Sequence, residues 1–278
     1  PPYSLPAETV AEIERQTVAL AKELRVVGLM NIQFAVKDGV VFILEVNPRA
    51  SRTAPFVSKA TGVPLPRLAT QVMLGKTLKE LDPWSMRRSG YVSVKESVFP
   101  FRRFPGVDIL LGPEMRSTGE VMGIAPTFEE AFLKGQWGAG QKLPEGGKVF
   151  LSVNDRDKRF VAEVARQYVD LGFELLATSG TAGLLAGQGI PSTRVLKVYE
   201  GRPNIVDLIK NGEVSLVINT ASGKRTAHDS KAIRQATLHY GVPYSTTLSG
   251  AKAIARAIGA ARTTEVRVKS LQEYYKGE

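Results

Sequence analysis

Cysteine is absent from the 278 residues of this chain, and histidine occurs only twice, as His228 and His239. The absence of cysteine excludes disulfide bonds, thiolate catalysis and cysteine-based zinc sites together. Two histidines also make a histidine-based metal site a poor interpretation. Neither thiol chemistry nor zinc binding is therefore expected of this protein.

Long apolar runs are missing as well. No stretch approaches the length of a transmembrane helix, and the first residues, PPYSLPAE, lack the basic region and apolar core of a signal peptide. We therefore expect a cytoplasmic protein with no membrane association. Hydrophobic residues make up 43% of the chain and charged residues 23%, as in an ordinary globular protein, and the length allows two modest domains.

Acidic residues are outnumbered. The chain has 37 lysines and arginines against 27 aspartates and glutamates, a formal net charge of +10, which implies anionic partners. The basic residues form no long block and no aromatic-basic repeat, so we do not expect nucleic-acid binding. Many stand beside glycine, serine and threonine turns, a pattern that favours small phosphorylated ligands.

The stretch NIQFAVKDGVVFILEVNPRASR, residues 31–52, predicts a β-hairpin. Two apolar runs flank Asp38-Gly39, which is a strong turn signal. Because side chains alternate between the two faces of a strand, Glu45 and Asn47 are expected on one face together with Ile43.

Polar side chains converge on this face of the hairpin. A loop of three residues would bring Gln33 opposite or diagonal to Glu45, and Arg49 follows where the second strand ends. Carboxylate and amide oxygens suit Mg²⁺, and arginine suits phosphate oxygens. We infer a metal–phosphate site; an edge hairpin with a solvated polar face is the alternative.

The remaining sequence before residue 148 has mixed signals. The elements that we expect are a helix over 8–25 capped by Thr9, two short helices within 55–81, a strand over 91–99, an irregular stretch over 100–126, a helix over 128–134 and a turn-forming stretch over 135–147. The predicted domains are residues 1–140 and 148–278, joined by a linker over 141–147.

Strands and helices alternate after the linker. The predicted strands are 149–153, 173–177, 195–198, 214–219 and 243–247, and the predicted helices are 158–171, 182–188, 205–210, 230–240 and 251–260. This alternation predicts an α/β fold with a five-stranded parallel sheet that helices cover on both faces.

The turns at the carboxyl ends of these strands carry anion-binding groups. TSGT follows the second strand and NTASGKR the fourth, Lys158 begins the first helix, and Lys197 ends the third strand. Ligands of such sheets bind at this edge, where hydroxyls and free helix N–H groups can hold an anion. We predict a phosphate site; ordinary helix capping is the alternative.

Several of these segments resemble one family. The run NIQFAV…FILEVNPRASRTAPFVSKATGVPL resembles the end of an ATP-grasp domain, and more narrowly that of the second ATP-grasp unit in the carbamoyl phosphate synthase large chain. SVKESVFPF and PGVDILLGPEMRSTGEVMG continue the resemblance. It implies the C-terminal portion of an ATP-dependent ligase that makes carbamoyl phosphate from bicarbonate and glutamine-derived ammonia, with this half phosphorylating carbamate.

The resemblance also implies roles for the hairpin residues. Gln33, Glu45 and Asn47 would hold Mg²⁺ or Mn²⁺ against the phosphates of ATP, and Arg49 would steady the transferring phosphoryl group, with K⁺ as a further candidate ion. The implied partners are the remainder of the large chain and a glutaminase small subunit, in a hetero-oligomer. No glycine-rich loop or nucleotide-holding lysine precedes residue 31, so the chain alone is expected to be inactive.

The last part resembles the methylglyoxal-synthase-like regulatory domain of the same family. Five positions match residues that hold a nucleotide effector, UMP or IMP: Lys158, Thr178, Thr181, Lys197 and Asn219. Ala221 stands where family members often have a second threonine, which leaves the nucleotide preference open.

The resemblance further implies an ornithine site at Glu96, Tyr244 and Thr246. Glu96 interrupts an apolar strand, where a buried carboxylate needs a cationic partner. The alternative is that Glu96 pairs with Arg102 or Arg103, and that Tyr244 and Thr246 are ordinary strand residues.

Three other functions compete. A true methylglyoxal synthase needs a carboxylate in the turn after the fourth strand, and NTASGKR has none. The cyclohydrolase domain of purine synthesis resembles FLSVNDRDK and GFELLATSGTA, but this resemblance fades after Val198. A stand-alone nucleotide-sensing module without catalysis remains the main alternative.

Overall fold

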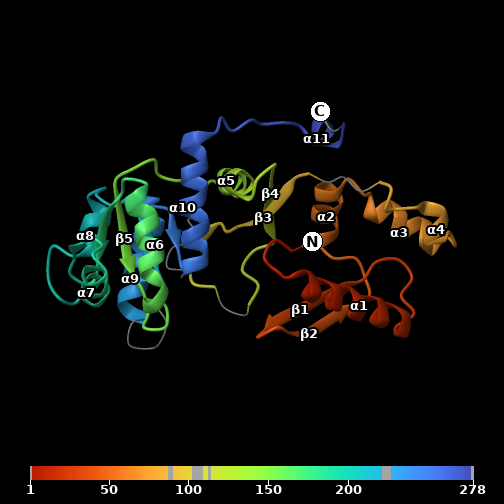
Figure 1. Cartoon of the computed structure of the whole chain (residues 1–278), viewed down its shortest axis with the longest axis horizontal. Coiled ribbons are helices and arrows are strands. Elements are labelled where there is room, and N and C mark those ends of the chain that lie inside the picture. The colour runs from red at the N-terminus through yellow and green to blue at the C-terminus, as the bar shows by residue number, and fades with distance from the viewer. Residues whose placement is uncertain (1, 87–89, 102–108, 112–113, 221–226, 277–278) are drawn as a thin grey trace. The chain divides into compact units, whose positions relative to one another are not determined.

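The computed structural model describes residues 2–86, 90–101, 109–111, 114–220 and 227–276 (Figure 1). The chain forms two compact units, one of Pro1–Gly90 with Val268–Glu278 and one of Tyr91–Arg267. Each unit is described by itself below. The functional division at residues 140 and 148 stays a prediction.

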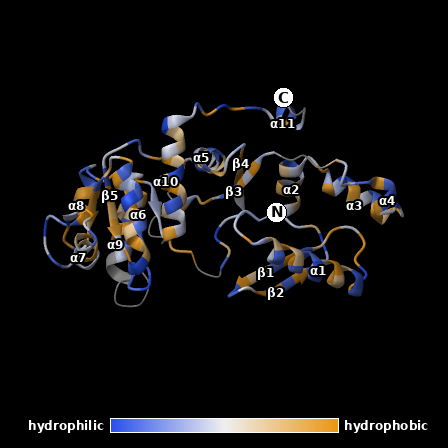
Figure 2. Cartoon of the chain, in the orientation of Figure 1, coloured by the Kyte–Doolittle hydropathy of each residue, from blue (hydrophilic) through white to orange (hydrophobic). Residues whose placement is uncertain are grey.

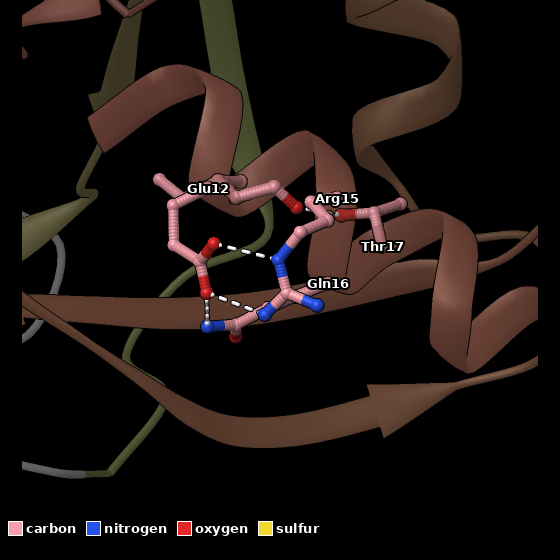
Figure 3. A network of polar contacts seen from close by, with 5 residues as sticks. Glu12, Arg15, Gln16 and Thr17 are labelled. Atoms are coloured by element: carbon pink, nitrogen blue, oxygen red, sulfur yellow. Dashed lines mark hydrogen bonds and ion pairs between the residues drawn. The ribbon is translucent and has the colours of Figure 1, made fainter. Parts of the chain in front are cut away.

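The first unit opens with helix α1, Ala7–Glu23, as the apolar spacing predicts. The predicted cap is wrong, because Pro6 precedes the helix and Thr9 is a buried residue of its first turn. On the exposed face, Glu12 accepts hydrogen bonds from Arg15 and Gln16 within one helical turn (Figure 3). These bonds lower the pKa of Glu12 to about 2.

Strands β1, Asn31–Lys37, and β2, Val40–Asn47, form the predicted antiparallel hairpin. Asp38 and Gly39 both adopt positive φ, of 52° and 78°, so the loop has two residues rather than three. A register shift between Gln33 and Phe34 nevertheless pairs Gln33 with Glu45. Ile43 pairs with Phe34, so the prediction that it shares the face of Glu45 is wrong.

Short helices complete the first unit. The predicted pair is α2, Thr53–Thr61, and α3, Leu65–Met73. Two further helices were not predicted: α4, Leu78–Leu81, and α11, Leu271–Lys276. A capping box between Thr77 and Glu80 starts α4 and gives its sequence signal.

The second unit begins with a β-hairpin covered by a helix. Strand β3, Val92–Val98, is the predicted one. Its partner β4, Gly119–Ala125, lies in the stretch that we expected to be irregular. Gly119 at its start and Gly123 within it hid the strand pattern. Helix α5, Phe128–Gly138, runs past its predicted end into the predicted turn-forming stretch 135–147.

A five-stranded parallel sheet follows, in the order β7-β6-β5-β8-β9. Its strands are β5 Lys148–Ser152, β6 Glu174–Ala177, β7 Thr193–Arg194, β8 Leu216–Asn219 and β9 Tyr244–Ser245. The prediction of a parallel sheet is confirmed by every pairing. Strand β7 ends at Arg194, just before its predicted start, so Lys197 lies in the loop beyond it.

Helices cover both faces of this sheet, as predicted. They are α6 Lys158–Asp170, α7 Ser179–Gly187, α8 Ile205–Lys210, α9 Ala227–Tyr240 and α10 Leu248–Thr263. Alternate residues of β5, which is largely hydrophobic (Figure 2), enter two separate cores: Val149 and Leu151 pack with α6 and α10, and Phe150 packs with α8 and α9. Each fully buried side chain of this kind contributes roughly 1.5–3 kcal/mol.

Within the described ranges, none of the helices combines the length and the apolar character that a membrane span requires.

Candidate functional site

The polar face of the β1–β2 hairpin forms a small cluster around one carboxylate. Gln33 Nε2 donates to Glu45 Oε1 at 2.7 Å, and Asn47 Nδ2 donates to the same oxygen at 2.9 Å. The bulge in β2 makes this meeting possible, because an unbroken two-residue hairpin would have paired Gln33 with Leu44. The structure therefore brings all three predicted residues together.

Two further residues border this cluster. Arg49 donates its backbone N–H to the carbonyl of Asn47 at 2.8 Å, and its guanidinium donates to the carbonyl of Ala50 at 3.0 Å. Asn31 pairs with Asn47 across the hairpin and was missed, although alternation along β1 places it on the same face as Gln33.

The donor set of the cluster fits a hard divalent cation. One carboxylate and two or three amides offer oxygens, the ligands that Mg²⁺ prefers. Among the described residues, no group of three or more His, Cys, Asp or Glu side chains could hold a metal ion. A cation at Glu45 would thus depend on substrate phosphates and water for its remaining ligands.

A second set of polar residues gathers at the carboxyl edge of the parallel sheet. Thr178 precedes α7 and is 5% exposed, and Thr181 is 1% exposed. The hydroxyl of Thr181 accepts a hydrogen bond from the N–H of Val153 at 3.5 Å. Ser179 Oγ is buried at the start of the same helix and makes no hydrogen bond within the described part of the chain.

Lys158 reaches this edge from the first turn of α6. Its ammonium contacts the carboxylate of Asp155 at 2.6 Å, which lowers the pKa of Asp155. A Cβ placed on Gly180 would lie 3.6 Å from Lys158 Nζ. The lysine therefore lies beside the N-terminus of α7, and among the described residues its ion-pair partner is an exposed carboxylate.

The sheet order reverses between β5 and β8 at this edge, the usual place for a ligand crevice. Asn219 ends β8 and is 3% exposed. Asn154, which was not predicted, joins the two strand ends by donating to the carbonyl of Thr220 at 2.6 Å. Ala221, whose effect on nucleotide preference was left open, lies outside the described residues.

Lys197 stands apart from the other four predicted residues. It lies in the loop after β7, where its Nζ donates to the hydroxyl of Tyr199 at 3.4 Å, and its backbone N–H donates to Glu200 at 3.0 Å. This loop continues directly from the pairing of β6 with β7, since the N–H of Val195 donates to the carbonyl of Ala177. Lys197 and Thr178 thus lie at the ends of adjacent strands.

A cavity of about 730 Å³ in the second unit contains the three residues predicted for ornithine: Glu96, Tyr244 and Thr246 line it together. Thr247, the N-cap of α10, and Gly250 in its first turn also line it. Arg102 and Arg103, the alternative partners of Glu96, lie outside the described residues.

Comparison with known families separates the chain into two matched regions. Residues 1–81 match the carbamoyl-phosphate synthase L chain, ATP binding domain, and residues 160–246 match the MGS-like domain.

Curated relatives connect the two regions. The large chain from Mesorhizobium japonicum is 53% identical over 283 residues, which cover 99% of this chain and 24% of the relative. Those from Myxococcus xanthus and Rhodopirellula baltica are each 54% identical and also cover 99% of this chain. All three are named carbamoyl phosphate synthase large chain.

This chain matches a C-terminal portion of the carbamoyl phosphate synthase large chain. It spans about a quarter of the length of the curated relatives it matches. The match confirms the predicted resemblance and the predicted fold, the end of an ATP-grasp domain followed by an MGS-like α/β domain. The cluster at Glu45 lies within the ATP-binding match, and Thr178, Thr181, Lys197 and Asn219 lie within the MGS-like match.

Proposed function

We propose that this chain supplies the part of a carbamoyl phosphate synthase that phosphorylates carbamate with ATP. One observation supports this proposal most strongly: within a segment that matches an ATP-binding domain, a β-bulge gathers Gln33, Glu45 and Asn47 around one carboxylate oxygen. A cation site at this face accounts for the shifted register of the hairpin without a further role.

In this proposal Gln33, Glu45 and Asn47 hold Mg²⁺ or Mn²⁺, with K⁺ as a further ion. The bound cation supplies charge neutralisation for the phosphates of ATP. An oxygen of carbamate forms a bond to the γ-phosphorus as the bond from that phosphorus to the β–γ bridging oxygen breaks, which yields carbamoyl phosphate and ADP. Arg49, at the border of the cluster, steadies the transferring group, whose charge is spread over three oxygens.

The proposal implies partners. The remainder of the large chain supplies the nucleotide-holding elements, and a glutaminase small subunit supplies ammonia, so the working form is a cytoplasmic, glutamine-hydrolysing hetero-oligomer. The 278 residues alone are then inactive.

We further propose that the sheet edge binds a nucleotide monophosphate, UMP or IMP. Lys158, Thr178, Thr181, Lys197 and Asn219 would hold it. The start of α7, the hydroxyl of Ser179 and the ammonium of Lys158 all suit a phosphate dianion.

Ornithine is proposed for the cavity at Glu96. The carboxylate suits a side-chain ammonium, and the hydroxyls of Tyr244 and Thr246 with the N-terminus of α10 suit the carboxylate of an amino acid.

A chimeric enzyme tests the catalytic proposal. The matched quarter of the Myxococcus xanthus large chain is replaced by this chain and assayed with its small subunit for ATP-dependent formation of carbamoyl phosphate. We expect activity within about tenfold of the unmodified enzyme, because the replaced part is 54% identical. A folded chimera that makes no carbamoyl phosphate would argue against the proposal.

The alternative is a nucleotide-sensing module without catalysis. It is favoured if the inert chimera still binds UMP or IMP through the sheet edge, since the module would then be the only working part.

A further inference from the structure

Glu96 is a carboxylate on the face of β3 that it shares with three valines, and it is half-buried against α5. Burial raises the pKa of Glu96, and a hydrogen bond from the side chain of Gln136 counteracts that rise. Gln136 is itself only 8% exposed, on the helix that covers the β3–β4 hairpin. An amide in such a place must donate and accept within the protein or to a ligand.

Glycines determine how closely Gln136 approaches the carboxylate. A Cβ on Gly123 of β4 would lie 1.8 Å from the carbonyl oxygen of Ala131 and 2.6 Å from the nitrogen of Gly135. A Cβ on Gly135 would lie 3.5 Å from the Cβ of Glu96. The helix therefore rests directly on the strands at the position before Gln136, which brings the backbone of Gln136 close to the strand that carries Glu96.

Few other charged groups lie near Glu96 among the described residues, which do not include Arg102 and Arg103. Lys95 and Glu120 pair with each other at 2.8 Å, and Lys95, as the next residue along β3, points to the opposite face. From the remaining described elements, Lys142 and the phenol of Tyr244 line the same cavity as Glu96 and Gln136. Within the described part of the chain, the carboxylate of Glu96 thus accepts its side-chain hydrogen bond from the neutral amide of Gln136.

We propose that Gln136 is the positioning residue of Glu96: it aims the carboxylate into the cavity and thereby gives the site its preference for an amino acid with a cationic side chain. The proposal rests on the proposed ornithine site. It predicts that loss of the amide of Gln136 weakens the binding of a ligand with a side-chain ammonium far more than the binding of an isostere without that ammonium.

The variant Gln136→Met tests this on the full chain, since methionine keeps the length and fills the space. Calorimetry compares ornithine with norvaline, which has the same carbon chain without the side-chain amine. We expect ornithine to bind about ten times more weakly and norvaline within about twofold of its original affinity. In the Glu96→Gln background, Gln136→Met should change ornithine affinity less than about twofold, because the residue acts through Glu96.

Gln141→Met is the matched control, because Gln141 lines the same cavity from the loop after α5. Equal losses for ornithine and norvaline in Gln136→Met, or additive losses in the double variant, would overturn the positioning role.

A ligand-free measurement separates the two proposals. Carbon-13 NMR of labelled glutamate, assigned with Glu96→Gln, follows the titration of Glu96. The pKa of Glu96 should rise in Gln136→Met and stay unchanged in Gln141→Met. An unchanged titration in Gln136→Met overturns the role of Gln136. A shifted titration in a chain that binds no ornithine supports that role and overturns the ornithine site.

Discussion

The two lysines at the sheet edge, Lys158 and Lys197, have different neighbours. Lys158 already has an anionic neighbour in Asp155, whereas Lys197 contacts a neutral phenol. A bound phosphate would therefore compete with Asp155 for the ammonium of Lys158. It would contact the ammonium of Lys197 without such competition. The two lysines, equal in the sequence pattern, are unequal in the structure.

Substitutions at this edge should change nucleotide affinity in opposite directions. Lys197→Ala should weaken UMP or IMP binding about ten- to a hundredfold, since a hydrogen bond to a charged group is worth roughly 1.5–3 kcal/mol. Asp155→Asn should strengthen it about two- to fivefold, because it releases the ammonium of Lys158 from a weak, exposed ion pair. Calorimetry on the chain measures both.

Lys148→Ala is the control, because Lys148 begins β5 at the opposite edge of the sheet and pairs with Glu213. It removes the same charge and should leave nucleotide affinity unchanged. Equal losses of affinity in Lys148→Ala and Lys197→Ala would reduce the edge to general electrostatic attraction.

At the scale of elements, the hairpin shows what the sequence could and could not predict. Alternation along β2 correctly placed Glu45 and Asn47 together, because side-chain parity is local. The cross-strand partner depended on loop length and on a bulge at Leu44, which no residue type around that position reveals. Gln33 was thus correctly predicted as the partner of Glu45, but from a wrong loop length. Ile43 was assigned to the wrong face.

Helix α5 shows the same limit. Its start was predicted, but its close packing on β4 depends on Gly123, in a stretch too rich in glycine to show as a strand. Likewise, the convergence of Glu96, Tyr244 and Thr246 on one cavity came from resemblance, because they lie in elements almost 150 residues apart.

Gly123→Ala should therefore damage the second unit severely. The new methyl group would overlap the backbone of α5, which cannot move as a side chain can, so we expect a loss of about 3 kcal/mol or more in the free energy of unfolding. Chemical denaturation measures this loss.

Gly183→Ala makes the same change in α7, where nothing lies within 4 Å of the added Cβ. It should stabilise the chain by roughly 0.5–1 kcal/mol, as alanine favours a helix interior over glycine. Similar stabilities for the two variants would contradict the close packing of α5.

At the scale of the whole molecule, two proposed sites lie in a chain that spans about a quarter of the length of its curated relatives. The proposed metal–phosphate cluster lies in the ATP-binding match, and four of the five residues proposed for the nucleotide lie in the MGS-like match. The resemblance to the family was predictable from motifs along the chain. The bounds of the compact units were not, since β3, β4 and α5 belong to the same unit as the parallel sheet.

The central claim is that Glu45 holds the cation at which carbamate is phosphorylated. The most direct measurement is ATP synthesis from carbamoyl phosphate and ADP by the chimeric enzyme carrying Glu45→Gln, compared with Val40→Gln, which alters the same face at the far end of β2. Removing the one carboxylate of the cluster should abolish this reaction without unfolding the protein, since Glu45 is exposed, and Val40→Gln should leave it intact. Near-normal ATP synthesis by Glu45→Gln would contradict the assignment.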